Sequence, residues 1–244
     1  MSDTAYDFAV VCEAPADRNS GCLLADRVLL EELDWLTPET LKAVRKWRGS
    51  AAEKPFLRWA SVREECAQAG IKGIFGKFGG QPGAPDAYAA RLALLLLSAH
   101  GARPSAVVLL RDRDGEARRR TGLEQARDER KWPFPVIIGV AEPKRECWVL
   151  AGFEPKTDDE TARVEEERKR LSFHPIYDAH QLTPSTHGAK KDAKKVLEAL
   201  RAPNKNKDWA LPPRGEPPQT GFLLGALTQG DAVRERLCLE ETPL

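Results

Sequence analysis

Short, uninterrupted apolar runs that alternate with helical patterns constrain the fold of this chain more than any other feature. The strongest run covers residues 106–110 (Ala-Val-Val-Leu-Leu), and residues 8–12 and 134–140 have the same character. A strand that is apolar on both faces is typical of a parallel sheet covered by helices. Because strands alternate with helices, we expect parallel βαβ units. The sequence therefore predicts an α/β fold with a parallel four-stranded sheet between helices.

Helical patterns fill the segments between these strands. We expect helices over residues 22–36, 38–48, 61–70, 86–100 and 116–130. Thr37 and Pro38 suit the cap and the first position of the second helix. Ser61 and Glu64 form a capping-box pattern at the start of the third. A short strand is expected over residues 73–78.

The chain divides into two parts by pattern. Residues 1–155 hold the α/β pattern, with a helical insertion at about 37–60. Residues 156–244 form a helical and loop-rich C-terminal extension. Within it we expect helices over 161–171, 186–201 and 222–239, with a Pro-, Lys- and Asn-rich stretch before the last one.

Composition excludes several classes of protein. The chain has 38 Lys and Arg residues and 37 Asp and Glu residues, so it is not basic overall. Binding to nucleic acid would therefore need a local basic face. The five cysteines are scattered without CxxC spacing, which predicts neither disulfides nor a zinc site. No segment approaches the ~20 apolar residues of a membrane span, and the N-terminal residues lack a secretory pattern. We therefore expect a cytoplasmic protein that does not bind membranes.

Acidic residues follow three of the expected strands. Glu13 follows the first, Asp112 and Asp114 the strongest, and Glu142 and Glu146 the last. The carboxyl ends of parallel strands meet at one edge of a sheet, where ligands bind. Crowded carboxylates raise each other's pKa, and a divalent cation relieves that conflict. Oxygen ligands suit Mg²⁺ or Mn²⁺, so the sequence predicts such a site.

The Asp112-x-Asp114 pair has a spacing that suits metal binding. Residues i and i+2 directly after a strand can point to the same side, and Gly115 allows a sharp turn. Alone, the DxD pattern also occurs in glycosyltransferases, phosphatases and surface turns. The order strand–Glu, strand–DxD, strand–Glu is more specific.

That order resembles the TOPRIM family, which includes metal-dependent domains of topoisomerases, primases and overcoming-lysogenization-type nucleases. The matching segments are Val-Val-Cys-Glu-Ala-Pro-Ala-Asp, ending at Asp17, and Val-Val-Leu-Leu-Arg-Asp-Arg-Asp, ending at Asp114. Arg-Glu-Cys-Trp-Val-Leu, which contains Glu146, is similar to the Glu-x-Trp segment of small standalone bacterial TOPRIM-like proteins. The resemblance covers about the first 155 residues. Ala14 stands where the family usually has Gly, so topoisomerase-like strand transfer is not expected.

The resemblance implies a role for each matching residue. Glu13 would be a metal ligand or general acid/base, Asp112 and Asp114 metal ligands, and Asp17 and Glu146 a second-metal set. It also implies a TOPRIM-like sheet, an ATPase partner and an antiphage role.

Basic residues near these acids fit phosphodiester chemistry. Two metals about 4 Å apart can hold a scissile phosphate and generate hydroxide. Lys144, between Glu142 and Glu146, is the candidate to stabilise developing negative charge. Arg118, Arg119 and Arg120 follow the DxD loop and are candidates for binding a nucleic-acid backbone.

The first hypothesis is therefore a Mg²⁺- or Mn²⁺-dependent nuclease that acts on DNA or RNA. The second is a non-catalytic regulatory or interaction subunit of an ATPase-containing complex, with a vestigial metal site. A third is a glycosyltransferase that uses the DxD pair on a nucleotide sugar, although such chemistry needs no acid at Glu13. A receiver-like phospho-switch also has acids after strands, but normally two at the end of the first strand.

Overall fold

The computed structural model describes residues 6–72, 78–99, 101–183 and 189–201. Its strands are β1 (Tyr6–Cys12), β2 (Arg45–Arg48), β3 (Leu57–Arg58), β4 (Ala106–Asp112) and β5 (Val136–Ala141). Its helices are α1 (Pro15–Glu32), α2 (Pro38–Val44), α3 (Val62–Gln68), α4 (Ala84–Ala99), α5 (Arg119–Asp128), α6 (Arg145–Ala151), α7 (Asp158–Leu171) and α8 (Ala193–Arg201), with short 3-10 turns at Trp59–Ser61 and Ala179–Gln181. The expected α/β class is confirmed.

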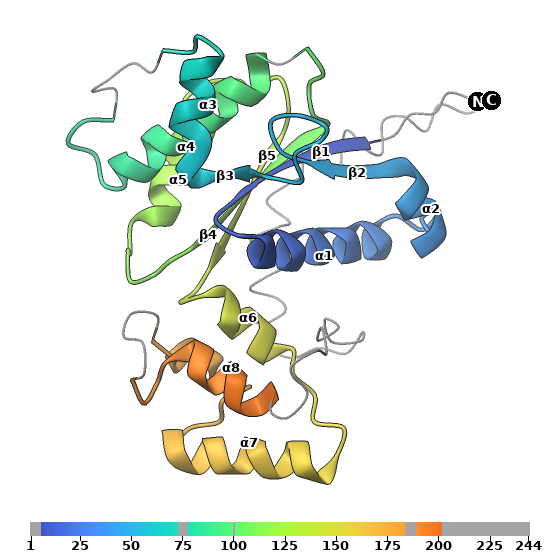
Figure 1. Cartoon of the computed structure of the whole chain (residues 1–244), viewed down its shortest axis with the longest axis vertical. Coiled ribbons are helices and arrows are strands. Elements are labelled where there is room, and N and C mark those ends of the chain that lie inside the picture. Colours follow the sequence, from blue (N-terminus) through green and yellow to red (C-terminus); the bar gives the residue numbers. More distant parts are fainter. Residues whose placement is uncertain (1–5, 73–77, 100, 184–188, 202–244) are drawn as a thin grey trace. The chain divides into compact units, whose positions relative to one another are not determined.

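The strands form one sheet in the order β2-β1-β4-β5, and β3 also pairs with β1. β1 is parallel to β2, β3 and β4. Hydrogen bonds from Val107 N to Pro135 O and from Arg113 N to Ala141 O keep a constant offset, which is the register of a parallel β4–β5 pair. Helices α1 and α2 lie on one side of the sheet, and α3, α4 and α5 lie on the other (Figure 1).

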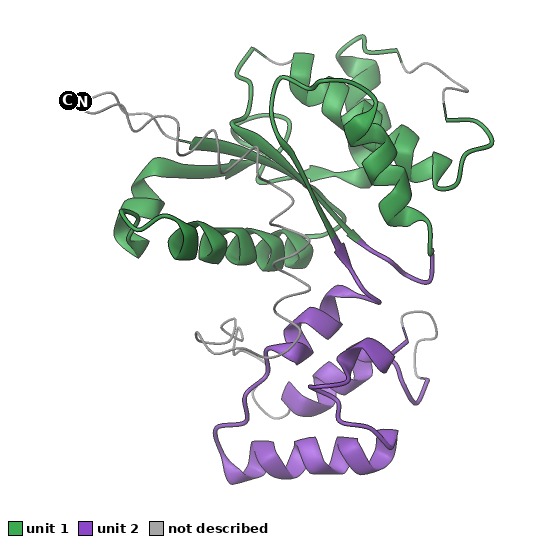
Figure 2. Ribbon diagram, turned by 180° about the vertical axis from the view of Figure 1, so that it is seen from behind, with its two compact units in different colours: residues 1–111, 117–139, 223–244 green, residues 112–116, 140–222 purple. Residues whose placement is uncertain are grey.

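The chain separates into two compact units (Figure 2). Unit 1 contains the described residues up to Arg111 and those in 117–139, and unit 2 contains 112–116 and the described residues from Val140 onward. This division differs from the expected boundary at residue 155. Unit 2 takes in the carboxyl end of β4, the end of β5 and helix α6.

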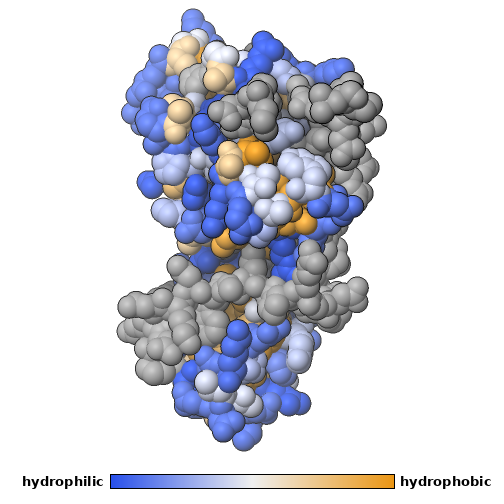
Figure 3. Space-filling model, turned by 90° about the vertical axis from the view of Figure 1, so that its right-hand side faces the viewer, coloured by the Kyte–Doolittle hydropathy of each residue, from blue (hydrophilic) through white to orange (hydrophobic). Residues whose placement is uncertain are grey.

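Each unit has a hydrophobic core of its own. In unit 1, Val10 and Cys12 of β1 pack with Val108 and Leu110 of β4 against Cys22 of α1. In unit 2, buried residues of α6, α7, α8 and the segments that connect them form a separate cluster: Cys147, Leu150, Phe153, Val164, Leu171, Ile176, Ala179, Leu182, Ala193, Val196, Leu197 and Leu200. No described helix is long and apolar enough to span a membrane. On the face shown in Figure 3, hydrophilic residues cover most of the surface that is not grey, and hydrophobic residues form small groups.

The segment that follows α1 differs from the prediction. The helix expected over 38–48 ends at Val44, and residues 45–48 form β2 along β1. Arg45 and Trp47 both contact Asp26 of α1, whereas Arg48 pairs with Asp7. These alternate partners are typical of a strand, so the insertion at about 37–60 is not wholly helical. Thr37 does cap α2, through its side-chain oxygen and the backbone N of Thr40.

Other element boundaries also move. α1 begins at Pro15 rather than at residue 22, because Pro suits the first helical position and Asp17 accepts a hydrogen bond from Ala14 N. α3 is present, but Ser61 donates to Glu65 instead of capping the helix with Glu64. α4 begins at Ala84, so Asp86 lies in its first turn. Of the strand expected over 73–78, only residue 78 is among the described residues. The helix expected over 222–239 lies wholly outside them.

Candidate functional site

Unit 2 contains the two aspartates of the DxD pair, Asp112 at the end of β4 and Asp114 in the loop that follows it. Asp114 has a φ of +48° and Gly115 a φ of +81°, so the backbone turns sharply where the glycine predicted it. Arg113 N donates to Ala141 O at 2.8 Å, and Asp114 N donates to Pro143 O at 3.2 Å. The loops after β4 and β5 are thereby joined side by side.

The junction of these two loops brings predicted site residues together. Asp112 Oδ1 accepts a hydrogen bond from Arg145 N at 2.9 Å. Lys144 Nζ lies 3.6 Å from Asp114 Oδ1. Both aspartates therefore face the same segment after β5, which agrees with the expectation that residues i and i+2 point to one side. Lys144 is largely buried, with 17% of its side chain exposed, so its charge acts in a partly desolvated setting.

Glu146 lies in the first turn of α6 and is buried. Its Oε1 accepts from Arg145 at 3.0 Å. The pKa of the neighbouring Cys147 thiol is raised to about 12, chiefly by burial, and the carboxylates of Glu146 and Asp112 contribute to the rise. Arg145 connects Glu146 to the DxD pair, because its backbone N donates to Asp112 and its guanidinium donates to Glu146. The helix that carries Glu146 was not predicted, because the only sequence pattern that could indicate it is the short apolar run of residues 147–151.

Unit 1 carries Glu13 directly after β1. Its side chain is 44% exposed, and Arg111 lies 3.6 Å from its Oε1. Asp17 Oδ2 accepts from Ala14 N at 2.8 Å and so holds the first turn of α1. That contact is a structural use of Asp17, and its role as a ligand of a second metal stays a prediction.

The three arginines after the DxD loop have different surroundings. Arg118 is exposed, Arg119 Nε lies 3.6 Å from Asp86, and Arg120 pairs with Glu124 at 3.4 Å. Arg111 was not singled out from the sequence, although it contacts Glu13 and also Asp86. Only its place immediately before Asp112 could have drawn attention to it.

The donor chemistry of unit 2 fits a hard divalent cation. Asp112, Asp114 and Glu146 offer carboxylate oxygens and no soft ligand, which suits Mg²⁺ or Mn²⁺. In the part of the chain that the structure describes, no three His, Cys, Asp or Glu side chains are already arranged to hold a metal ion. Binding by this set would require the carboxylates to exchange Lys144 and Arg145 for the ion.

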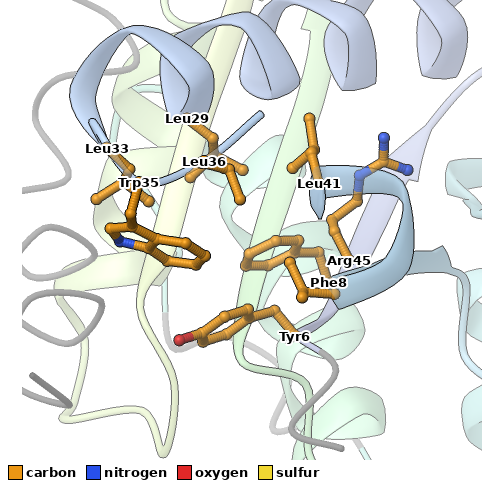
Figure 4. Close-up of a pocket in the computed structure, with 9 residues that line it drawn as sticks. Tyr6, Phe8, Leu29, Leu33, Trp35, Leu36, Leu41 and Arg45 are labelled. Carbon is orange, nitrogen blue, oxygen red and sulfur yellow. The ribbon is translucent and has the colours of Figure 1, made fainter. Parts of the chain in front are cut away.

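An apolar pocket lies in unit 1, apart from any of these acids. Side chains of β1, α1 and α2 line it, together with Trp35 and Arg45 (Figure 4). Its one charged lining residue, Arg45, is paired with Asp26. Its lining residues include no Asp, Glu, His or Cys, so it offers none of the usual metal ligands.

Comparison of the chain with models of protein families, with curated proteins and with solved structures finds no match. The function must therefore be argued from the chain's own residues.

Proposed function

We propose that this chain is a Mg²⁺- or Mn²⁺-dependent nuclease of the TOPRIM type that hydrolyses phosphodiester bonds in DNA or RNA. One observation carries the proposal: Asp112 and Asp114 both face the segment Lys144–Arg145 after the neighbouring strand. Carboxylates can hold the metal of metal-assisted phosphodiester hydrolysis, and a partly buried lysine beside them can stabilise negative charge on the phosphate. Glu146 lies near the same loop.

Each residue has a distinct part in this proposal. Asp112, Asp114 and Glu146 hold the metal, which supplies an activated water and neutralises charge on the phosphate. Lys144 stabilises the negative charge that develops on the phosphate oxygens. From the family resemblance, Glu13 is a further ligand or general acid/base and Asp17 belongs to a second-metal set. The ATPase partner and the antiphage role come from the resemblance alone.

The test is calorimetric titration of the metal-free protein with Mn²⁺. We expect the double variant Asp112→Ala/Asp114→Ala to lose binding by about 100-fold or more, because the two DxD ligands are gone. Glu31→Gln is the matched control, since Glu31 is also an ion-paired carboxylate, 2.8 Å from Arg27. Loss of Mn²⁺ binding in the control as well would remove the assignment to the DxD loop.

A cleavage assay then separates binding from catalysis. Single- and double-stranded DNA and RNA are incubated with the protein and Mn²⁺, and Asp112→Ala is expected to abolish cleavage while circular dichroism shows an unchanged fold. An Asp112→Ala protein that cleaves as well as the wild type would overturn the proposal. Lys144→Met should lower the cleavage rate but bind Mn²⁺ at least as tightly as the wild type, because Lys144 no longer competes with the ion for Asp114.

The non-catalytic alternative is favoured by one observation. Every candidate carboxylate already contacts a donor of the chain: Glu13 contacts Arg111, Asp17 contacts Ala14 N, Asp112 contacts Arg145 N, Asp114 contacts Lys144 and Glu146 contacts Arg145. Such compensation would let the acidic set persist without a metal. Mn²⁺ affinity without cleavage of any nucleic acid, alone or with a partner, would favour this regulatory subunit.

A further inference from the structure

Arg111 is held in unit 1 from three directions. Its Nε lies 3.2 Å from Asp86 Oδ1, and its Nη1 lies 3.6 Å from Glu13 Oε1. Its guanidinium also lies over the ring of Trp59, 5.1 Å from the centroid. Trp59 is itself fixed, because its indole N–H donates to Leu110 O at 2.8 Å. A guanidinium restrained in this way loses little side-chain entropy when it binds a ligand.

A second arginine shares the same carboxylate. Arg119 Nε, in the first turn of α5, lies 3.6 Å from the Asp86 oxygen that Arg111 contacts. The exposed fractions of the Arg111, Arg119 and Asp86 side chains are 19%, 13% and 14%. Two partly desolvated guanidinium groups therefore share the Asp86 carboxylate, and Arg111 also contacts Glu13, whose carboxylate is half in water and more strongly screened.

The backbone contributes partial positive charge at the same place. The first turns of α4 and α5 meet here, and a Cβ on Gly122 would lie 2.3 Å from Gly83 O. The glycines permit this approach because neither has a side chain. Each helix carries partial positive charge at its N-terminus, and Asp86 is the one acidic residue in these two first turns.

We propose that Arg111 and Arg119 form a binding site for one phosphate of a nucleic-acid strand, and that this phosphate displaces Asp86, which pairs with both guanidinium groups in its absence. Planar guanidinium groups bind phosphate oxygens in pairs, and Arg is preferred for this geometry. The nature of the ligand rests on the nuclease proposed above, but binding at this site requires neither metal nor cleavage. Arg111 is in this view a substrate-positioning residue.

The test is fluorescence anisotropy of a labelled single-stranded oligonucleotide, DNA and RNA in turn, with the full-length protein in EDTA. We expect Arg111→Gln to weaken binding about tenfold, as the loss of one charge-assisted contact predicts. The slope of log K against log salt should fall in magnitude by about 0.7. Arg111→Lys should keep the wild-type slope but bind more weakly. Arg127→Gln is the control, because Arg127 pairs with Asp128 at the other end of α5.

The Asp86→Asn variant distinguishes binding from a structural role. If Asp86 competes with the phosphate for the two arginines, removing its charge should tighten oligonucleotide binding several-fold, whereas a scaffold that merely loosened would bind less. Weaker binding by Asp86→Asn in a folded protein, or unchanged binding by both Arg111 variants, overturns the site. Displacement of the oligonucleotide by equimolar inorganic phosphate would also overturn it, because the ligand would then be free phosphate.

The outcomes separate this site from the nuclease. Binding that responds to Arg111 and Asp86 in a protein without cleavage would retain the phosphate site and remove the nuclease. If the protein cleaves nucleic acid but its oligonucleotide affinity is unchanged by substitutions at Arg111 and Asp86, the nuclease is retained and the phosphate site is removed. A wild-type protein that binds neither DNA nor RNA strands overturns the phosphate site outright.

Discussion

At the scale of single residues, the buried ion pair of Arg91 and Glu129 gives a prediction for the stability of unit 1. Arg91 Nε lies 2.8 Å from Glu129 Oε2, and the two side chains are only 6% and 4% exposed. Removing one partner of a buried pair leaves the other charge uncompensated. We expect Glu129→Ala to lower the free energy of unfolding by about 3–5 kcal/mol, measured by urea denaturation.

The neighbouring residue provides the control for this pair. Asp128 contacts Arg127 at 2.7 Å, but 63% of its side chain is exposed. Asp128→Ala should therefore cost less than about 1 kcal/mol. Equal effects of the two substitutions would contradict the burial of the Arg91–Glu129 pair.

Cysteine reactivity gives a second prediction at this scale. Burial raises the pKa of Cys12, Cys22 and Cys147 to about 12. At pH 8 about one such thiol in ten thousand is a thiolate, the form that reacts. We expect iodoacetamide to leave these three residues unlabelled in the native protein and to label them in urea, as counted by peptide mass spectrometry. Rapid native labelling of Cys12 or Cys147, which adjoin Glu13 and Glu146, would instead indicate a reactive thiol.

The sequence predicted part of the geometry of the candidate site. The turn at Gly115 and the common direction of Asp112 and Asp114 follow from local rules for the end of a strand. The contacts of Arg111 do not, because Asp86 and Trp59 come from distant parts of the chain. Long-range ion pairs leave no periodic signal in the sequence. The role of Arg118, Arg119 and Arg120 in binding nucleic acid stays a prediction, and of their contacts only the Arg120–Glu124 pair, at i,i+4 spacing, follows a local rule.

At the scale of elements, the loop after β2 and helix α3 are joined through Glu65. Burial would raise the pKa of the Glu65 carboxyl, but hydrogen bonds from Ser50, Lys54 and Ser61 outweigh burial and lower it from 4.5. Lys54 Nζ lies 3.0 Å away and Ser61 Oγ 3.1 Å away. A carboxyl whose folded-state pKa is lowered stabilises the fold above its unfolded-state pKa. That stabilisation is lost as pH falls from 4.5 through the lowered value.

The prediction for Glu65 concerns the shape of the pH profile. Thermal melting followed by circular dichroism should show Glu65→Gln less stable than the wild type at neutral pH. Below pH 4.5 the wild type should lose stability more steeply, so the two melting curves converge. Parallel pH profiles of the two proteins would contradict a lowered pKa at Glu65.

The contact of α4 with α5 predicts an unusual effect of a Gly-to-Ala change. Alanine normally stabilises a helix interior by about 0.5–1 kcal/mol relative to glycine. At Gly122 the new Cβ would lie 2.3 Å from Gly83 O, a backbone atom that cannot rotate away. We therefore expect Gly122→Ala to destabilise by about 1–3 kcal/mol in urea denaturation. Gly101→Ala, which meets no atom within 4 Å, is the control, and stabilisation by Gly122→Ala would argue against this contact.

Element type followed from sequence where apolar runs are continuous. β1, β4 and β5 are buried on both faces, and a strand of this kind is recognised in a sequence by its continuous apolar run. β2 was not predicted, because Arg45–Arg48 consists of three basic residues and one Trp and has no alternation of apolar and polar residues. Its strand character shows only in the contacts of its side chains, which go alternately to Asp26 and Asp7. The start of α1 was missed because residues 15–21 carry almost no apolar side chain, and Gly21 packs where a Cβ would lie 2.2 Å from Leu110 Cδ1.

At the scale of the whole molecule, the hydrophobic clusters formed by the described residues of the two units share no residue. The core of unit 2 is built by α6, α7 and α8 with the turn at Ala179–Gln181, all after the last strand. The cores of unit 1 are built on β1, β4, α1 and α2. The sequence did not locate this division, because β4 and β5 run through it without any change of composition. Since cooperative unfolding follows packed cores, the two units should open as separate cooperative regions.

Paired core substitutions test this separation. Leu200 in unit 2 and Leu94 in unit 1 are both fully buried. Replacing either with Ala should cost about 2–5 kcal/mol in its own unit. In hydrogen exchange followed by mass spectrometry, we expect Leu200→Ala to speed exchange in α6, α7 and α8 while β1 and α4 stay protected, and Leu94→Ala to do the opposite. If Leu200→Ala accelerates exchange equally in β1 and α4, the units unfold as one, and the DxD loop is then coupled to the stability of the entire sheet.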